Sequence, residues 1–374
     1  MAGSLLNWSV TGDKLIMHRL LGLVLRERDL TAGRWPQTIA ICLDLLEPRL
    51  FDHQTGWGRR EEGNDLVTQI AAVFANTPED SSIDLVQRLL QARSWAVKQL
   101  SAASDLSRAI TLGKEVASDY ERILGNQNPF TFMAWDDAAY ALLAADQHGA
   151  NPGCAREAVA LYERTGAERR RVFGERHPDT ITSQYNLAYA YYCAHRWGES
   201  IPLYKEVVAA RGQMLGSRHP DTIKARHGLG SAYIPVHRLN EGITLLSQTL
   251  KDCEEVLGST HPDTLAVCRS LGIAYFTESR ISGRWIPEAL SLLKRTLDGR
   301  KQVLGGDHPE TIASLLELGV GYFRSGNEKF AARIFRDTVA ISERVLGPDH
   351  PNTIIACHNL EGVAHLIIDE PPDD

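Results

Sequence analysis

The sequence Leu215-Gly216-Ser217-Arg218-His219-Pro220-Asp221-Thr222 is one of five copies of a short motif. The spacing between successive motif histidines is 42 residues, except for 47 residues between the third and the fourth. The five histidines are His177, His219, His261, His308 and His350. A weaker copy, in which Asn128 stands in place of the histidine, precedes them. A fixed period of this length is typical of a solenoid, in which each repeat packs only on its neighbours.

The motif has the chemistry of a turn between two helices. Gly216 follows an apolar helical run and suits the left-handed residue just past a helix end. Pro220 suits the first position of the next helix, where its missing N–H costs nothing. Asp221 then faces the positive end of that helix's dipole. The motif therefore predicts that one helix ends and another begins at each copy.

Each period holds two helical segments. Residues 180–194 are rich in apolar and small side chains, and the pattern breaks at Arg196-Trp197-Gly198 before an amphipathic run continues to Leu215. A leucine stands ten residues after every motif histidine, usually followed by a small residue, as in Leu229-Gly230. Small residues let two helices approach closely. Each repeat is therefore predicted to be a helical hairpin.

The recurring histidines invite a metal interpretation, which helix geometry excludes. Neighbouring helices pack about 8 to 10 Å apart, so equivalent residues of successive hairpins cannot share one ion at bond lengths of about 2 Å. We assign these histidines a structural role in closing the turn between repeats. No metal site and no cofactor are predicted.

This pattern resembles the tetratricopeptide repeat, in the 42-residue form found in kinesin light chains and in many signalling proteins. The resemblance covers residues 81–368 and implies an all-α right-handed superhelix, an α-solenoid. Ser200 and Gly242 depart from it, because they stand where the family prefers alanine. The 47-residue spacing indicates an insertion near Ser279 to Arg284.

The resemblance also implies a binding surface. In this family the first helix of every hairpin lines a concave groove, and the contact residues lie eight to sixteen positions after the repeat histidine. A peptide or protein segment is the implied partner. The candidate groove residues are Asp136, Asp137, Tyr140, Tyr185, Asn186, Tyr189, His227, Arg269 and Arg324.

The amino-terminal segment has a different pattern. Residues 5–10 and 14–17 read as two short strands around a turn at Thr11-Gly12-Asp13, and a helix is expected from His18. Residues 16–26 resemble the end of the winged-helix segment that joins an NB-ARC nucleotide switch to a tetratricopeptide sensor in STAND signalling ATPases. This resemblance implies a nucleotide-binding switch as a partner on the N-terminal side. The chain has no GxxxxGK[ST] phosphate loop, so it is not expected to bind ATP through that machinery.

These patterns predict four regions along the chain. Residues 1–30 form a winged-helix remnant made of a short β-hairpin and a helix, and residues 31–125 form a helical region with degenerate repeats. The tetratricopeptide array spans 126–368, and an acidic tail spans 369–374. Within the second region, helices are expected at about 35–52, 57–75, 81–100 and 105–124.

The composition limits the classes of partner that the chain is expected to bind. The 374-residue chain has 40 Lys and Arg against 47 Asp and Glu, a net charge of -7, so it lacks the basic field of a nucleic-acid-binding protein. It contains no run of about 20 apolar residues that could span a membrane, and no signal-peptide pattern. A cytoplasmic protein with no nucleic-acid or membrane partner is predicted. The six scattered cysteines are expected to be reduced and buried.

Three functions are compatible with the sequence. The first is a non-catalytic binding module that acts as the sensor of a STAND-like switch, and the second is a stand-alone scaffold resembling the repeat region of kinesin light chains. The third is an enzyme that uses the solenoid cavity, with Asp136 or Asp137 as an acid. Adjacent residues on a helix point about 100° apart, so only one of the two can face a given pocket. No nucleophile motif supports catalysis, so no catalytic residue is assigned.

Overall fold

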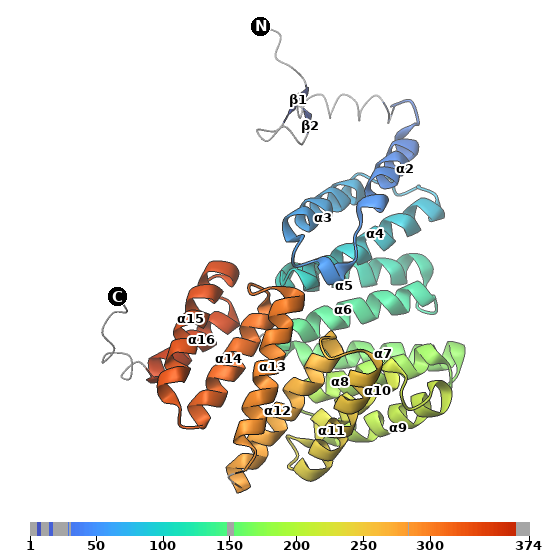
Figure 1. Ribbon diagram of the computed structural model, residues 1–374. Helices are drawn as coiled ribbons and strands as arrows, with labels where there is room; N and C mark the ends of the chain where they lie inside the picture. The colour runs from blue at the N-terminus through green and yellow to red at the C-terminus, as the bar shows by residue number, and fades with distance from the viewer. Residues whose placement is uncertain are drawn as a thin grey trace. The chain divides into compact units, whose positions relative to one another are not determined.

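The computed structural model describes residues 6–8, 15–17, 29, 31–147, 153–282 and 284–363. The chain divides into two compact units, Met1–Tyr120 and Glu121–Asp374. Both units are built from consecutive helices that follow one another along the chain (Figure 1).

The first unit begins with a small antiparallel hairpin. Strand β1 (Leu6–Trp8) pairs with β2 (Leu15–Met17), so that Leu6 lies opposite Met17. The hairpin occurs where it was predicted, with shorter strands. The helix expected from His18 lies outside the described residues.

The helices of the first unit are close to those predicted, with two differences. Helix α2 ends at Leu46 and continues as the 3-10 turn η1, because Pro48 has no N–H with which to extend the α-helical pattern. Helix α3 begins at Arg60 and not at Trp57. The elements are α2 (Trp35–Leu46), η1 (Glu47–Arg49), η2 (His53–Thr55), α3 (Arg60–Ala75), α4 (Ile83–Ala102) and α5 (Leu106–Leu124).

Two tryptophans tie this unit together, because each donates an indole N–H to a distant backbone carbonyl. Trp35 Nε1 lies 2.6 Å from the oxygen of Asn76, and Trp95 Nε1 lies 2.7 Å from that of Phe51. Each bond satisfies the polar atom of a half-buried aromatic side chain.

The second unit is a series of helical hairpins, as the repeats predicted. The first helices are α6 (Pro129–Gln147), α8 (Pro178–Cys193), α10 (Pro220–Tyr233), α12 (Pro262–Ser282), α14 (Pro309–Arg324) and α16 (Pro351–Val363). The second helices are α7 (Cys154–Phe173), α9 (Trp197–Leu215), α11 (Leu239–Val256), α13 (Ile286–Leu304) and α15 (Glu328–Leu346). First helices of successive hairpins also contact one another, as in α6 with α8, α8 with α10, α10 with α12 and α14 with α16.

The motif histidines cap the helices that follow them. Nδ1 of His219 accepts a hydrogen bond from the backbone N–H of Asp221 at 3.2 Å, and the same bond forms at the other four copies. In the weak copy, Oδ1 of Asn128 accepts from the N–H of Phe130 at 2.9 Å. Each cap satisfies an N–H that has no partner within the helix. The structural role predicted for the histidines is confirmed.

The motif glycines have the positive φ that was predicted, but a different ψ. Gly216 has φ 92° and ψ 158°, and Gly174, Gly305 and Gly347 are similar. This is an extended conformation that is essentially restricted to glycine, and not the left-handed helical one. The expectation of a left-handed helical residue is therefore corrected. The chain leaves the helix extended, which places the histidine for its cap.

Both departures from the alanine pattern have a packing explanation. The buried hydroxyl of Ser200 donates to the backbone oxygen of Ala188 at 2.8 Å. In the next repeat, a Cβ added to Gly242 would lie 3.0 Å from the backbone oxygen of Gly230. The two positions are equivalent points of contact between the helices of a hairpin. Ser200 makes a hydrogen bond across this contact, and Gly242 lets the two backbones approach closely.

The insertion lengthens α12, which continues to Ser282. Trp285 then takes a left-handed conformation with φ 72° and stacks on Tyr275, with ring centroids 4.9 Å apart. The repeat register resumes with α13. Among the described helices, none combines the length and apolar character needed to cross a bilayer.

Candidate binding surface

The nine predicted residues lie on the first helices of the second unit. Those on α6 and α8 form what we call the α6–α8 cluster. Its members are Asp136, Asp137, Tyr140, Tyr185, Asn186 and Tyr189. The other three are on separate helices, with His227 on α10, Arg269 on α12 and Arg324 on α14. Because α6 contacts α8, the structure brings the six cluster residues onto neighbouring helices.

A buried tyrosine on α7 contacts this cluster. Tyr162 on α7 is 3% exposed, and its hydroxyl lies 3.4 Å from the backbone oxygen of Asp136. Burial raises the pKa of Tyr162 well above its ordinary value, and the charges of Asp136 and Asp137 and the phenols of Tyr140 and Tyr189 raise it further. The hydroxyl of Tyr162 therefore joins α7 to the backbone of α6 at the cluster.

Tyr140 is the exposed member of the cluster. It exposes 57% of its surface, and neighbouring protein atoms cover the rest. This burial raises the pKa of Tyr140, and the negative charge of Glu310 on α14 raises it further.

Tyr185 has a different role, because much of its ring belongs to the core. It packs edge-to-face on Tyr204 with centroids 5.8 Å apart, and the guanidinium of Arg211 lies 4.7 Å from its ring centre. Burial raises the pKa of Tyr185 to about 12. Its contribution is mainly to hold α8 against α9.

Arg169 on α7 connects the two helices of the cluster. Its Nη1 donates to Oδ2 of Asp136 at 2.7 Å and to Oγ of Ser183 at 2.6 Å, and the residue is 7% exposed. Arg169 is not among the residues predicted from the sequence. The signal was the recurrence of arginine at the same position in Arg211 and Arg300. Arg300 repeats the contact, donating to Oγ of Ser314 at 2.8 Å.

The next two predicted residues pair with a neighbouring first helix. Nε2 of His227 lies 2.8 Å from Oγ of Ser270, and burial lowers the pKa of His227 to about 4, so it is neutral at pH 7. Arg269 forms an ion pair with Glu317 on α14, where the two side chains are 40% and 22% exposed. His227 and Arg269 each lie eight residues after a motif histidine. Their partners, Ser270 and Glu317, each lie nine residues after the following motif histidine.

Arg324 lies in the last turn of α14, beside Phe323, which is 45% exposed. It is the predicted residue farthest along the array. In the described part of the chain, no three His, Cys, Asp or Glu residues gather in a way that could hold a metal ion.

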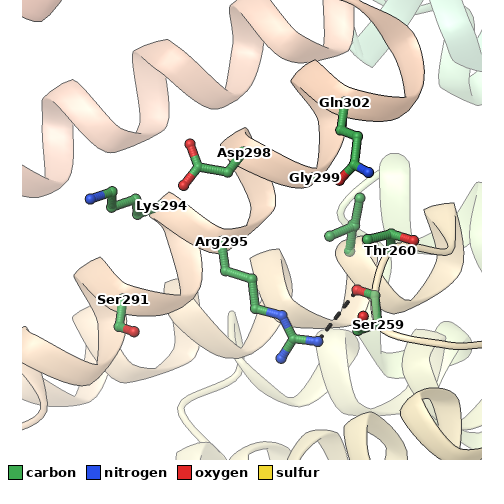
Figure 2. Close-up of a pocket in the computed structure, with 9 residues that line it drawn as sticks. Ser259, Thr260, Ser291, Lys294, Arg295, Asp298, Gly299 and Gln302 are labelled. Atoms are coloured by element: carbon green, nitrogen blue, oxygen red, sulfur yellow. Dashed lines mark hydrogen bonds between the residues drawn. The ribbon is translucent and has the colours of Figure 1, made fainter.

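A surface pocket of about 440 Å³ lies elsewhere, between the turn before α12 and helix α13. Figure 2 shows its polar lining, in which Arg295 donates to the backbone oxygen of Ser259 at 3.4 Å. Arg295 also forms an ion pair with Glu254 at 2.5 Å. None of the described residues that line this pocket is one of the nine predicted groove residues.

Comparisons with known proteins agree with this architecture. The tetratricopeptide repeat family model matches residues 153–213 and 280–344. No curated protein sequence matches the chain. Repeats of a putative kinesin light chain from Podosopora anserina are 28% identical, over 58% of this chain and 97% of that one, with a TM-score of 0.44.

Two more distant solved structures are also similar. A Rap protein complexed with Competence and Sporulation Factor is 12% identical over 89% of each chain, with a TM-score of 0.52. BtubC from P. vanneervenii is 14% identical over 72% of this chain and 94% of that one, with a TM-score of 0.44. The fold is a tetratricopeptide-repeat α-solenoid.

Proposed function

We propose that this chain is a non-catalytic binding module that holds a peptide or protein segment on the first helices of its second unit. The α6–α8 cluster carries this proposal. It brings the exposed ring of Tyr140 onto the same pair of contacting helices as two carboxylates and two further phenols. Aromatic rings beside fixed polar groups are typical of binding hot spots. Tetratricopeptide repeats are typical of protein-binding scaffolds, and the Rap structure contains a bound factor.

The internal pairs support a binding surface that exists before the ligand arrives. Arg169 fixes Asp136, Ser270 pairs with His227, and Glu317 pairs with Arg269. A surface ordered in advance loses less conformational entropy on binding. The same pairs leave these groups engaged, which favours binding over catalysis.

A displayed library of random hexapeptides tests the proposal. The full chain should retain a subset of peptides, and Tyr140→Ala with Tyr189→Ala should weaken their binding while the helical circular dichroism signal is kept. Lys294→Ala, an exposed change on the second helix α13, is the matched control and should bind normally. Equal binding by the tyrosine variant and the control would place the ligand elsewhere.

We also propose that the module is the sensor part of a nucleotide-dependent switch. The β1–β2 hairpin supports this, because it precedes the helices as the resemblance to winged-helix segments requires. The test is co-purification with an NB-ARC protein of the same cell. Deletion of residues 1–30 should abolish the association, and association that survives the deletion would contradict this role for the hairpin.

A further inference from the structure

Three arginines occupy equivalent positions in the array, each eight residues before a motif histidine. They are Arg169, Arg211 and Arg300. Arg169 forms an ion pair with the carboxylate of Asp136 at 2.7 Å, and Arg300 forms one with the carboxylate of Glu310 at 2.7 Å. Arg211 forms no ion pair with any residue that the structure describes. It is therefore the member of the series whose positive charge is left without an opposite charge in contact.

The sequence explains why Arg211 lacks a carboxylate partner. The position that holds Asp136 beside Arg169 holds Tyr185 in the next hairpin, and the guanidinium carbon of Arg211 lies 4.7 Å from the centre of the Tyr185 ring. Asp221 stands at the position of Glu310 and is one methylene group shorter. Only the backbone oxygen of Asp221 accepts a hydrogen bond from Nη1 of Arg211, at 2.9 Å.

The guanidinium of Arg211 consequently keeps unused donors. Ala225 stands where Ser183 and Ser314 accept hydrogen bonds from the equivalent arginines. Nε and Nη2 of Arg211 make no hydrogen bond within the described part of the chain, and neither atom is sealed from solvent. The residue as a whole is only 6% exposed. A charge buried this deeply without a partner is unfavourable, and an incoming carboxylate would offset that cost.

The hydroxyl of Tyr204 reaches the same region. Tyr204 and Arg211 are seven residues apart on α9, which places them on one face of the helix, and both pack against the ring of Tyr185. A Cβ added to Gly228 would lie 2.8 Å from the hydroxyl oxygen of Tyr204. Gly228 stands nine residues after its motif histidine, as the candidate groove residue Asn186 does. The Tyr204 hydroxyl therefore lies where another repeat presents a groove side chain.

We propose that the guanidinium of Arg211 pairs with a carboxylate of the bound segment, and that the Tyr204 hydroxyl donates a hydrogen bond to the same segment. This inference rests on the proposed function and specifies the chemistry of its ligand. A planar guanidinium holds a carboxylate through two parallel N–H···O bonds, which Nε and Nη2 supply together. One guanidinium balances one negative charge, which favours a carboxylate over a doubly charged phosphate. The carboxylate belongs to an acidic side chain or to the end of the segment.

The hexapeptide library tests this inference with the full chain. A retained peptide is synthesised in its parent form, in forms that carry asparagine or glutamine in place of each acidic side chain, and in a form with an amidated C-terminus. Fluorescence anisotropy should show affinity about tenfold weaker for one of these amide forms. That form identifies whether the recognised carboxylate is a side chain or the terminus.

Substitution of the arginine connects this carboxylate to its partner. Arg211→Met should weaken the parent peptide by a similar factor and leave the affinity of the sensitive amide form unchanged, because that form has no charge to lose a partner. Equal weakening of both forms would show a merely structural role for Arg211 and would contradict the inference. Lys205→Met removes an exposed positive charge from the same helix, and as the matched control it should alter neither affinity.

A second variant guards against misfolding of Arg211→Met. Arg211→Lys keeps the positive charge, so the preference for the parent peptide over its amide form should be partly retained. Equal affinity of the unmodified chain for the parent peptide and all its amide forms overturns this inference and leaves the proposed function standing. Retention of no hexapeptide at all overturns both.

Discussion

His227 on α10 and Ser270 on α12 share a hydrogen bond of 2.8 Å between two first helices of the array. Burial lowers the pKa of His227 to about 4, from an ordinary value of 6.5, and the nearby positive charges of Arg269 and Lys224 oppose the effect of Asp263. The imidazole of His227 is therefore buried in its neutral form.

The pH dependence of stability follows from this shift. The unfolded chain binds a proton at His227 below pH 6.5, whereas the folded chain binds it only near pH 4. The titration of His227 therefore leaves the free energy of unfolding unchanged above pH 6.5. As the pH falls from 6.5 toward 4, it lowers that free energy by up to about 3 kcal/mol. In urea unfolding, His227→Gln should reduce the slope of stability against pH in this interval. The exposed His195→Gln is the control, and equal slopes in both variants would contradict the prediction.

The histidine caps predict a graded effect of substitution. His219→Ala removes the acceptor for the N–H of Asp221 and should lower the free energy of unfolding by about 1 kcal/mol. His219→Asn should recover most of this loss, because Asn128 already makes the same cap in the weak repeat. Thermal unfolding of both variants provides the measurement. If asparagine destabilises as much as alanine, the cap is not the reason for the histidine.

The motif glycine predicts a loss that comes from the backbone alone. A Cβ added to Gly216 would meet no atom within 4 Å, but its φ of 92° is strained for alanine. Gly216→Ala should therefore cost roughly 1 to 3 kcal/mol. Gly212 lies four residues earlier in α9 and is equally unobstructed. There, Gly212→Ala should stabilise by about 0.5 to 1 kcal/mol, because the helix favours alanine. Melting temperatures that move in the same direction would refute this explanation.

The Arg269–Glu317 pair predicts a small and salt-sensitive coupling. The arginine side chain is 40% exposed, so water screens the interaction. A double-mutant cycle with Arg269→Met and Glu317→Gln should give a coupling energy of about 0.2 to 1 kcal/mol at low salt. It should decrease in 1 M salt, where charges are screened within about 3 Å. A coupling that is unchanged by salt would show that packing, and not charge, joins α12 to α14.

The turns were predictable because their signals are local. Gly216, His219 and Pro220 act within one turn of the chain, through backbone conformation and a cap two residues away. The extended ψ of the glycine was missed because glycine tolerates both conformations with positive φ. In the first unit, the end of α2 was placed too late, since Pro48 is also compatible with an irregular continuation.

The candidate surface was predictable as a set of positions but not as a set of contacts. The repeat register placed Asp136 and Tyr185 on first helices. It gave no sign that Asp136 is held by Arg169 or that Tyr185 packs on Tyr204. Those partners come from other helices, and their distances depend on how the hairpins stack.

The sequence by itself determined where each helix begins and ends in the repeats, because capping, proline and glycine act between residues close together in the chain. Only the tertiary structure decided which side chains are engaged within the protein, as Arg269 is with Glu317, and which remain exposed, as Tyr140 does. The physical reason is that ion pairs and burial depend on distances between helices. Those distances are set by the packing of many side chains together, and no single repeat specifies them.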